Sequence, residues 1–207
     1  MMRGRFIVLD GVEGAGKSTQ MPRIADWIRK RHGEPVTTRE PGGTPLAEQI
    51  RALTLADHDE PLPPMAELLM MFAARSVHLE NLVAPALDRG QWVLCDRFVD
   101  SSYAYQGAGQ GGRDEPIAWL EAQIVAARQP DLVFIFDLPV ERVMERVRQR
   151  QAMDRFDRAD TGFLQRVRDA YLRRAAADSS RYCVIDGAQP VDVVSRVIIE
   201  HLEARFA

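Results

Sequence analysis

Five short apolar runs, separated by helical patterns, constrain the fold more than any other feature of this sequence. The runs lie at residues 6–9, 35–38, 92–95, 132–136 and 182–185, and the second is the weakest. They are continuous instead of alternating, as in strands buried on both faces of a sheet. Helical patterns between such strands are typical of parallel sheets. We therefore predict an α/β fold, a five-stranded parallel sheet with helices on both faces.

Helical periodicity fills most of the intervening sequence. We predict helices at residues 17–31, 45–53, 64–87, 116–127, 140–150, 161–177 and 191–204. The helix at 64–87 is apolar around most of its circumference, more than one core face requires, and is compatible with a subunit interface. With 207 residues and 46% apolar composition, the chain suits one sizeable core, so we expect one domain over residues 1–207.

Composition and charge exclude several classes of function. The net charge of −3 gives no overall positive field for nucleic acid, so an anionic ligand has to be small and held locally. The most apolar stretch, at residues 65–87, carries charged side chains, and we expect no membrane span. Cys95 and Cys183 lie in short apolar runs, which favours reduced, buried thiols and a cytoplasmic protein.

A glycine-rich loop follows the first predicted strand. It fits the pattern GxxxxGK[ST], and a predicted helix begins where it ends. Glycines let successive amides point inward, and the helix dipole adds positive potential for phosphate. Lys17 would reach the β and γ phosphates and Ser18 would bind Mg²⁺, whereas a glycine turn without ligand is the alternative. We predict that ATP binds residues Gly11, Val12, Glu13, Gly14, Ala15, Gly16, Lys17, Ser18 and Thr19.

A second carboxylate ends the run at residues 92–95. Asp96 lies where phosphate-loop proteins place the acidic group that orients Mg²⁺, so we predict it as a metal ligand. The alternative is that Asp96 caps the next helix.

Another glycine pattern occurs at residues 107–112. Gly107-Ala-Gly109-Gln-Gly-Gly112 fits GxGxxG, but no apolar strand precedes it. We therefore expect a flexible loop there and no dinucleotide site.

Arginines supply the remaining candidate phosphate ligands. Arg39 and Arg97 each follow a predicted strand, although single arginines are mostly solvated surface residues. Arg75 lies in the apolar helix beside Phe72, where a guanidinium needs an acceptor.

An arginine-rich segment at residues 146–158 separates two predicted helices. We predict a lid that closes over ATP, excludes water and brings arginine charge to the transferring phosphoryl group. A charged helix end at the surface is the alternative. The segment contains Arg146, Arg148, Arg150 and Arg155.

Longer stretches occur in a recognisable order over nearly the whole chain. They are LDGVEGAGKST, TREPGGTPLAEQIR, ELLMMFAAR, DRFVDSSYAYQG, QPDL and RQRQAMDRFD. In this order they resemble bacterial thymidylate kinases, which are phosphate-loop nucleoside monophosphate kinases; TREPGGT and DRF followed by YQG are the specific elements. The resemblance implies a three-layer fold with a short lid, a homodimer, and Mg²⁺-dependent transfer of the γ-phosphoryl group of ATP to dTMP. The products would be ADP and dTDP, in dTTP biosynthesis.

The resemblance also assigns residues to the dTMP site. Arg39 and Arg97 would hold the monophosphate. Phe72 would stack on thymine, and Arg75 would donate to a thymine carbonyl. Without the resemblance, ordinary core packing is the alternative for Phe72.

Four more residues would complete that site. Ser102 and Gln106 would contact the base, and Glu13 would accept a hydrogen bond from the 3′-hydroxyl. Tyr105 would pack where a ribose 2′-hydroxyl would otherwise lie, with core packing again as the alternative.

Gly14 indicates where the catalytic arginine comes from. Some family members have an arginine at this place in the loop, and here the lid is arginine-rich instead. We therefore expect Arg148 or Arg150 to join Lys17 and Arg97 in catalysis, with adenine stacking as the alternative role for a lid arginine. The monophosphate is already anionic, so no general base is required.

Two other functions remain as alternatives. One is a kinase for a different nucleoside or monophosphate, and the other is an ATP-binding regulatory module without transfer activity. The chain lacks Asn-Lys-x-Asp, which argues against a GTP switch.

We also expect a cis Glu40–Pro41 bond that aims Arg39 inward.

Overall fold

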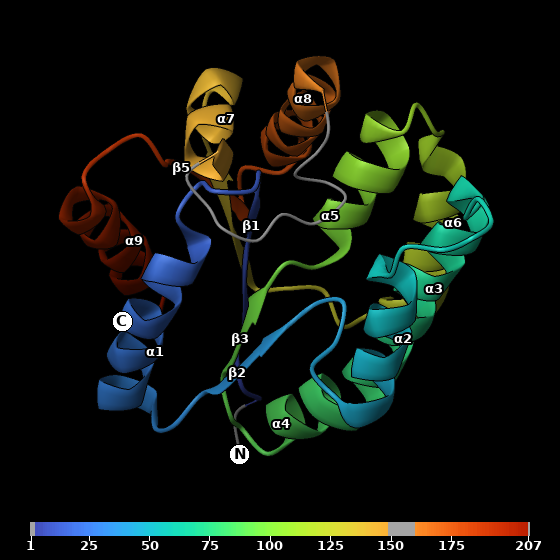
Figure 1. Cartoon of the computed structure of the whole chain (residues 1–207). Coiled ribbons are helices and arrows are strands. Elements are labelled where there is room, and N and C mark those ends of the chain that lie inside the picture. Colours follow the sequence, from blue (N-terminus) through green and yellow to red (C-terminus); the bar gives the residue numbers. More distant parts are fainter. Residues whose placement is uncertain (1–2, 149–159, 207) are drawn as a thin grey trace.

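A five-stranded parallel sheet forms the centre of the molecule (Figure 1). The computed structural model describes residues 3–148 and 160–206. Its strands are arranged in the order β2-β3-β1-β4-β5, and every neighbouring pair is parallel. They span Phe6–Gly11 (β1), Val36–Arg39 (β2), Val93–Asp96 (β3), Leu132–Asp137 (β4) and Tyr182–Asp186 (β5). The predicted five-stranded sheet is confirmed.

Burial explains why the central strands are continuous apolar runs. β1 is buried at every residue, and β4 at all but its last residue. Val8 of β1 pairs with Cys95 of β3 on one side and with Val133 of β4 on the other. The edge strand β2 alternates between half-buried and exposed residues, which accounts for its weaker apolar signal, and the other edge strand, β5, is also partly exposed.

Helices cover both faces of the sheet, as predicted. In Figure 1, α1 and α9 lie on one side and α2 to α6 on the other, while α7 stands at the carboxyl ends of the strands. α8 packs against β4, β5 and η2 (Tyr103–Gly109). The longer helices are α1 (Lys17–His32), α2 (Pro45–Leu55), α3 (Pro64–His78), α6 (Asp114–Ile124), α7 (Val140–Arg148), α8 (Thr161–Ala177) and α9 (Val191–Phe206). Within the described residues, every helix is too short or too polar to cross a membrane.

The single helix predicted at residues 64–87 is three helical segments. α3 passes into a π-helical turn, η1 (Leu79–Val83), and then into α4 (Ala84–Asp88). The amide of Ala84 donates to the carbonyl of Leu79, five residues earlier. Pro85 follows directly; it has no amide hydrogen, and its ring would crowd the carbonyl four residues before it. A wider turn relieves that crowding.

The expectation of a flexible loop at residues 107–112 is wrong for residues 107–109, which are helical. Helix α5 (Val99–Ser102) continues into a π-helix, η2 (Tyr103–Gly109). Gly107 and Gly109 are buried, and a Cβ at Gly109 would lie 2.8 Å from the Phe163 ring. These glycines permit close packing against neighbouring helices, so their composition resembles a loop while their structure is helical.

The Glu40–Pro41 peptide bond is cis, as predicted. The expected inward aim of Arg39 is wrong, because 54% of its side chain is exposed. Its guanidinium pairs with Glu48 of α2 at 2.9 Å, and Glu48 also accepts from the amide of Gly43 at 2.8 Å. A carboxylate on the neighbouring helix therefore holds Arg39 at the surface.

Candidate active site

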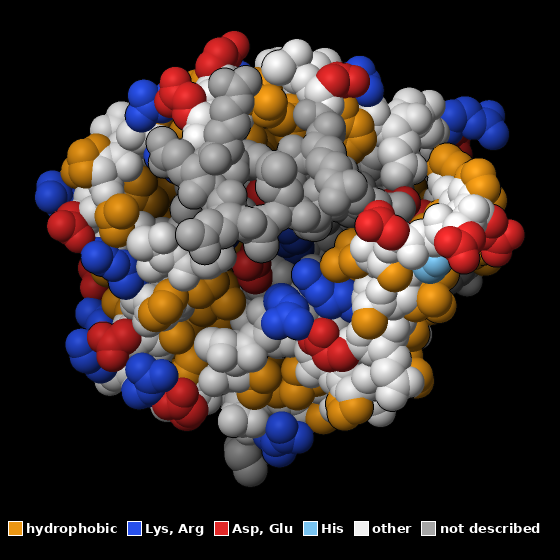
Figure 2. Space-filling model, in the orientation of Figure 1, with side chains coloured by type: hydrophobic (Ala, Val, Ile, Leu, Met, Phe, Trp, Pro, Cys, Tyr) orange, Lys and Arg blue, Asp and Glu red, His pale blue; other side chains and the backbone are white. Residues whose placement is uncertain are grey.

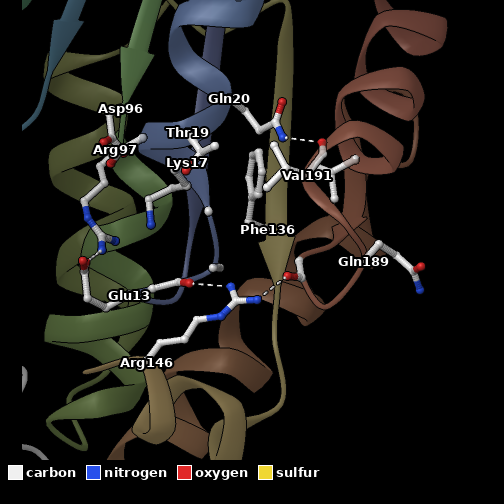
Figure 3. Close-up of a pocket in the computed structure, with 16 residues that line it drawn as sticks. Glu13, Lys17, Thr19, Gln20, Asp96, Arg97, Phe136, Arg146, Gln189 and Val191 are labelled. Atoms are coloured by element: carbon white, nitrogen blue, oxygen red, sulfur yellow. Dashed lines mark hydrogen bonds and ion pairs between the residues drawn. The ribbon is translucent and has the colours of Figure 1, made fainter. Parts of the chain in front are cut away.

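A hollow of about 340 Å³ opens at the carboxyl ends of the strands, around the glycine-rich loop. Figure 2 shows basic and acidic side chains gathered around a hollow near the centre of this face. The predicted loop residues from Glu13 to Thr19 line it, together with Asp96, Arg97 and Arg146. These side chains come from separate elements and converge on one space (Figure 3).

Backbone conformation shapes the loop between β1 and α1. Gly16 precedes the helix in the left-handed region with φ 104°, and Gly14 has φ 72°. Side chains other than glycine rarely adopt such angles, so the glycine pattern is required by the turn. The first turn of α1 consequently lines the hollow, where the helix dipole favours an anion.

Lys17 lies at the bottom of the hollow. Its Nζ donates to the carbonyls of Gly11 at 3.1 Å and Val12 at 3.0 Å, and the residue is 5% exposed. Burial, followed by the charge of Arg97, lowers the pKa of Lys17 from 10.5 to about 8. The amine is therefore held by its own loop, in a place where an incoming phosphate would stabilise its charged form.

Asp96 has a carboxylate oxygen that lacks a partner. Its Oδ1 is buried and accepts no hydrogen bond among the described residues. The alternative that Asp96 caps the following helix is wrong, because Phe98 precedes α5 and no side chain caps it. Ser18, whose side chain is exposed, lines the same hollow. An unpaired carboxylate oxygen and a hydroxyl in one hollow suit a hard cation such as Mg²⁺.

Arg97 joins the loop to the segment that follows β3. Its backbone adopts φ 68°, a left-handed conformation that is uncommon for a residue with a side chain. Its Nη2 donates to Glu13 at 2.7 Å, and its Nη1 donates to the carbonyl of Gly11 at 3.1 Å. The guanidinium also lies 5.2 Å from the centre of the Tyr105 ring. The structure thus brings Glu13, Arg97 and Tyr105 together, as the resemblance implied.

Asp10, the last side chain before the loop, was not among the predicted site residues. It is fully buried and accepts from the amides of Gly11 at 2.9 Å, Phe98 at 3.1 Å and Ser101 at 3.1 Å. The hydroxyls of Ser101 and Tyr171 donate to it at 2.8 and 2.7 Å. Burial above all raises the pKa of Tyr171, which keeps this hydroxyl a donor. Asp10 could have been identified from the sequence, because it is a carboxylate at the end of an apolar predicted strand.

Arg75 has the acceptors that its apolar surroundings require. It is 3% exposed, and its Nε donates to Glu40 at 2.7 Å. Its Nη1 donates to Ser102 at 3.2 Å and its Nη2 to the carbonyl of Phe98 at 3.1 Å. Glu40 was missed by the sequence analysis, although it follows Arg39 in the TREPGGT stretch. The contact with Ser102 brings two predicted base-binding residues together.

Phe72 is more enclosed than a base-stacking residue has to be. The ring is 1% exposed and belongs to the apolar core, and the Arg75 guanidinium lies 4.4 Å from its centre. A base would reach this ring only after the side chains around it shift. The structure therefore shows Phe72 as a core residue, and its base-stacking role stays a prediction.

One arginine of the predicted lid contacts the phosphate loop. Arg146 of α7 donates to the carbonyl of Gly14 at 2.7 Å and to the carbonyl of Gly187, after β5, at 3.1 Å. A Cβ at Gly14 would lie 3.5 Å from the Cβ of Arg146, an ordinary contact, so glycine is required here by its φ of 72° and not by the space. The side chain of Arg148 and all of Arg150 lie outside the described residues.

Comparisons with known proteins identify the family of this chain. A family model described as thymidylate kinase matches residues 9–198. A thymidylate kinase of Teredinibacter turnerae is 51% identical over 203 residues, covering 98% of this chain and 99% of the relative. One of Alcanivorax borkumensis is 46% identical, with 98% and 99% coverage. The crystal structure of thymidylate kinase from Ehrlichia chaffeensis superposes with a TM-score of 0.78 at 32% identity, covering 97% of this chain and 99% of that one.

The lowered pKa of Lys17 predicts proton uptake when ATP binds. The free amine loses its proton above a pKa of about 8, and adjacent phosphates raise that pKa by stabilising the ammonium. At a pH of about 9, ATP should therefore bind with uptake of most of one proton. Calorimetry in buffers of different ionisation enthalpy measures this number, with Lys17→Met as the control. Equal uptake by both proteins would contradict the assignment.

Proposed function

The chain belongs to the thymidylate kinase family, and we propose that it performs that family's reaction with the side chains gathered around Lys17 and Arg97. It is a phosphotransferase that takes the γ-phosphoryl group of ATP and transfers it to dTMP, giving dTDP and ADP. One observation carries the assignment of residues. Arg97 lines the ATP hollow while its guanidinium contacts Glu13 and Tyr105, two residues expected at the dTMP sugar.

ATP would bind with its phosphates over the loop and its adenosine towards the segment after β5. Backbone amides at the start of α1 and the Lys17 ammonium would hold the β and γ phosphates. Gln189 and Val191 line the other end of the hollow. Arg146 bridges the two sides and is placed to contact the nucleotide. Arg148 or Arg150 remains the predicted ligand of the γ phosphate.

Ser18 and Asp96 would hold Mg²⁺ together with the ATP phosphates. The buried, unpaired Oδ1 of Asp96 supports this assignment. Within the described residues, no group of three or more His, Cys, Asp and Glu side chains is arranged to hold a metal, so phosphate oxygens would supply the remaining ligands. When bound, the cation neutralises charge on the β and γ phosphates.

The dTMP monophosphate would bind between Arg39 and Arg97. Arg39 is exposed beside Glu48, and Arg97 is held by Glu13, so both guanidinium groups exchange a carboxylate partner for phosphate. The released Glu13 carboxylate would then accept from the 3′-hydroxyl. Two cations facing the phosphate also explain why an anionic substrate binds a chain of net charge −3.

The base and sugar would lie against α3, α5 and η2. Arg75, Ser102 and Gln106 would make polar contacts with thymine, Phe72 would stack on it, and Tyr105 would pack against the deoxyribose. Support comes from the Arg75–Ser102 contact at 3.2 Å and from the Arg75 guanidinium over Phe72. These side chains come from two helical regions that pack on each other.

Transfer would depend on alignment and charge stabilisation. The acceptor oxygen of dTMP is already anionic near neutral pH, so no side chain has to remove a proton. Lys17 and Arg97 would stabilise the charge that spreads over the transferring group, each contributing a few kcal/mol, roughly, to transition-state binding. Asp10 orders the Arg97 segment before substrate arrives, which lowers the reorganisation needed during transfer.

The protein would act as a homodimer through the outer surface of α2, α3 and α6. Large apolar side chains on these helices are about half exposed, although most residues of their type are buried in globular proteins. The helices pack side by side, α2 against α3 and α3 against α6 (Figure 1). The exposed side chains are Leu46, Leu53, Met65, Leu69 and Trp119.

Two broader assignments complete the proposal. The whole chain would form one catalytic domain, because a single sheet organises the described residues.

A cytoplasmic location fits Cys95 and Cys183, which are both free. Burial raises the pKa of the Cys95 thiol well above its usual value, so this cysteine is an inert part of the core.

A turnover panel tests the reaction. With ATP and Mg²⁺, we expect dTMP to give the highest kcat/KM among dTMP, dUMP, dCMP, AMP and thymidine, measured as ADP formation. Lys17→Ala should lower turnover by at least ~100-fold and leave dTMP affinity nearly unchanged, because its charge acts on the ATP phosphates. Preference for another acceptor would favour a different small-substrate kinase. No dTMP-dependent ADP formation would favour a regulatory ATP-binding module.

Sedimentation tests the dimer. We expect a species of twice the 23.3 kDa chain mass at micromolar concentration. Replacing both Leu53 and Leu69 by Asp should give a monomer, because two charges cannot be buried against an apolar face. Val184→Asp is the control, since Val184 is 49% exposed but lies on β5. A wild-type monomer, or an unchanged dimer in the double variant, would overturn the interface.

A further inference from the structure

A second buried carboxylate lies beside the proposed base site. Glu67 of α3 is 2% exposed, and its Oε1 accepts from the side-chain amides of Gln106 at 2.7 Å and Gln110 at 3.1 Å. The reaction described above assigns no role to this residue. A buried carboxylate is costly unless it is well paired, so a specific arrangement of its partners is expected.

Two polar contacts join the same pair of helical regions. Glu67 and Arg75 are eight residues apart on α3, about two turns, and therefore lie along one side of that helix. Ser102 and Gln106 are four residues apart at the junction of α5 and η2. Arg75 pairs with Ser102, and Glu67 pairs with Gln106. The two contacts consequently line one strip of the surface between these helices.

The chemistry of the Glu67 contact fixes the orientation of the Gln106 amide. A glutamine side chain has a donor NH₂ on one side and an acceptor oxygen on the other, and either side can face a neutral partner. A carboxylate only accepts, so Gln106 has to turn its NH₂ towards Glu67. Within residues 3–148 and 160–206, the Gln106 amide oxygen accepts no hydrogen bond. That oxygen is the group left for a ligand.

We propose that Glu67 is a positioning residue that sets the base selectivity of the enzyme, by holding the Gln106 amide with its oxygen towards the bound base. This inference rests on the proposed dTMP site. Arg75 only donates, and Gln106 held in this way only accepts. A donor beside an acceptor matches the thymine and uracil edge, where the C4 carbonyl adjoins an N3–H. Cytosine presents the reverse pattern, an amino group beside an acceptor nitrogen, and is rejected.

Rejection by reversed hydrogen bonds is strong because neither side can be satisfied. A cytosine amino group would face the donors of Arg75, and its ring nitrogen would face the oxygen of Gln106. A site built to hydrogen-bond one pattern discriminates far better than an apolar pocket does. If Glu67 were absent, the Gln106 amide could turn over and donate to that ring nitrogen, so part of the discrimination depends on a residue that does not touch the base.

The test is the ratio of kcat/KM for dTMP to kcat/KM for dCMP. Glu67→Gln keeps the size of the side chain but can donate as well as accept, so the Gln106 amide loses its fixed orientation. We expect kcat/KM for dTMP to fall at least ~10-fold and that for dCMP to fall less than ~3-fold, so that the ratio narrows. Equal losses on both substrates, or an unchanged ratio, would overturn the proposal.

Two further variants separate orientation from general damage. Gln110→Ala removes a second hydrogen bond to Glu67 and leaves the Gln106 contact, so its ratio of kcat/KM for dTMP to that for dCMP should match the wild type within about twofold. The exchange Glu67→Gln with Gln106→Glu keeps the charge and the hydrogen bond, and places an acceptor-only carboxylate beside the base. It should restore most of the dTMP preference.

The exchange also decides the question if the single change does not fold. The proposal would be contradicted if the exchanged protein had no higher ratio of kcat/KM for dTMP to that for dCMP than Glu67→Gln. It would also be contradicted if the exchanged protein folded but did not prefer dTMP. A wild-type protein that does not phosphorylate dTMP would contradict the proposed function instead. The two failures are therefore distinguishable, because only the second appears in the unmodified enzyme.

Discussion

The buried carboxylate of Asp10 is the interaction on which the rest of the site depends. It lies at the end of β1, immediately before the phosphate loop, and accepts hydrogen bonds from the segment after β3 and from Tyr171 of α8. One fully buried side chain thus connects the central strand, the Arg97 segment and the helix that follows the predicted lid. Such a carboxylate is stable only when its acceptor sites are filled, so the three elements are held in one arrangement.

Around this fixed centre, the cations of the site are held by partners that a ligand can replace. Lys17 donates to carbonyls of its own loop, Arg97 to Glu13 and Arg39 to Glu48. Phosphate groups provide stronger, charge-assisted acceptors in the same places. In the proposed reaction, binding would therefore exchange internal hydrogen bonds of these side chains for substrate contacts. Selectivity arises differently, from donors and acceptors whose orientation is set by buried carboxylates behind them.

The sequence predicted the sheet, most helices and the phosphate loop because these depend on local patterns. The five apolar runs became the five strands, and the glycine motif lies between β1 and α1 as its spacing required. The sequence did not predict the roles of Asp10, Glu40 and Glu67, because their partners are distant in the chain. The sequence separation reaches 161 residues for Asp10 and Tyr171. The helix at residues 99–109 was missed because its glycines serve close packing, which composition alone does not distinguish from a loop.

The proposed reaction requires the ATP and dTMP sites to adjoin at Arg97. The γ phosphate of ATP then lies next to the 5′-phosphate of dTMP. Calorimetric titration with a single molecule, in which the terminal phosphate of ATP is joined to the 5′-phosphate of thymidine, measures this most directly. The structure predicts one molecule bound per chain, at least ~100-fold tighter than either ATP or dTMP, because the second contact is made at high effective concentration. Binding no tighter than the better of the two separate substrates would show that the sites do not adjoin.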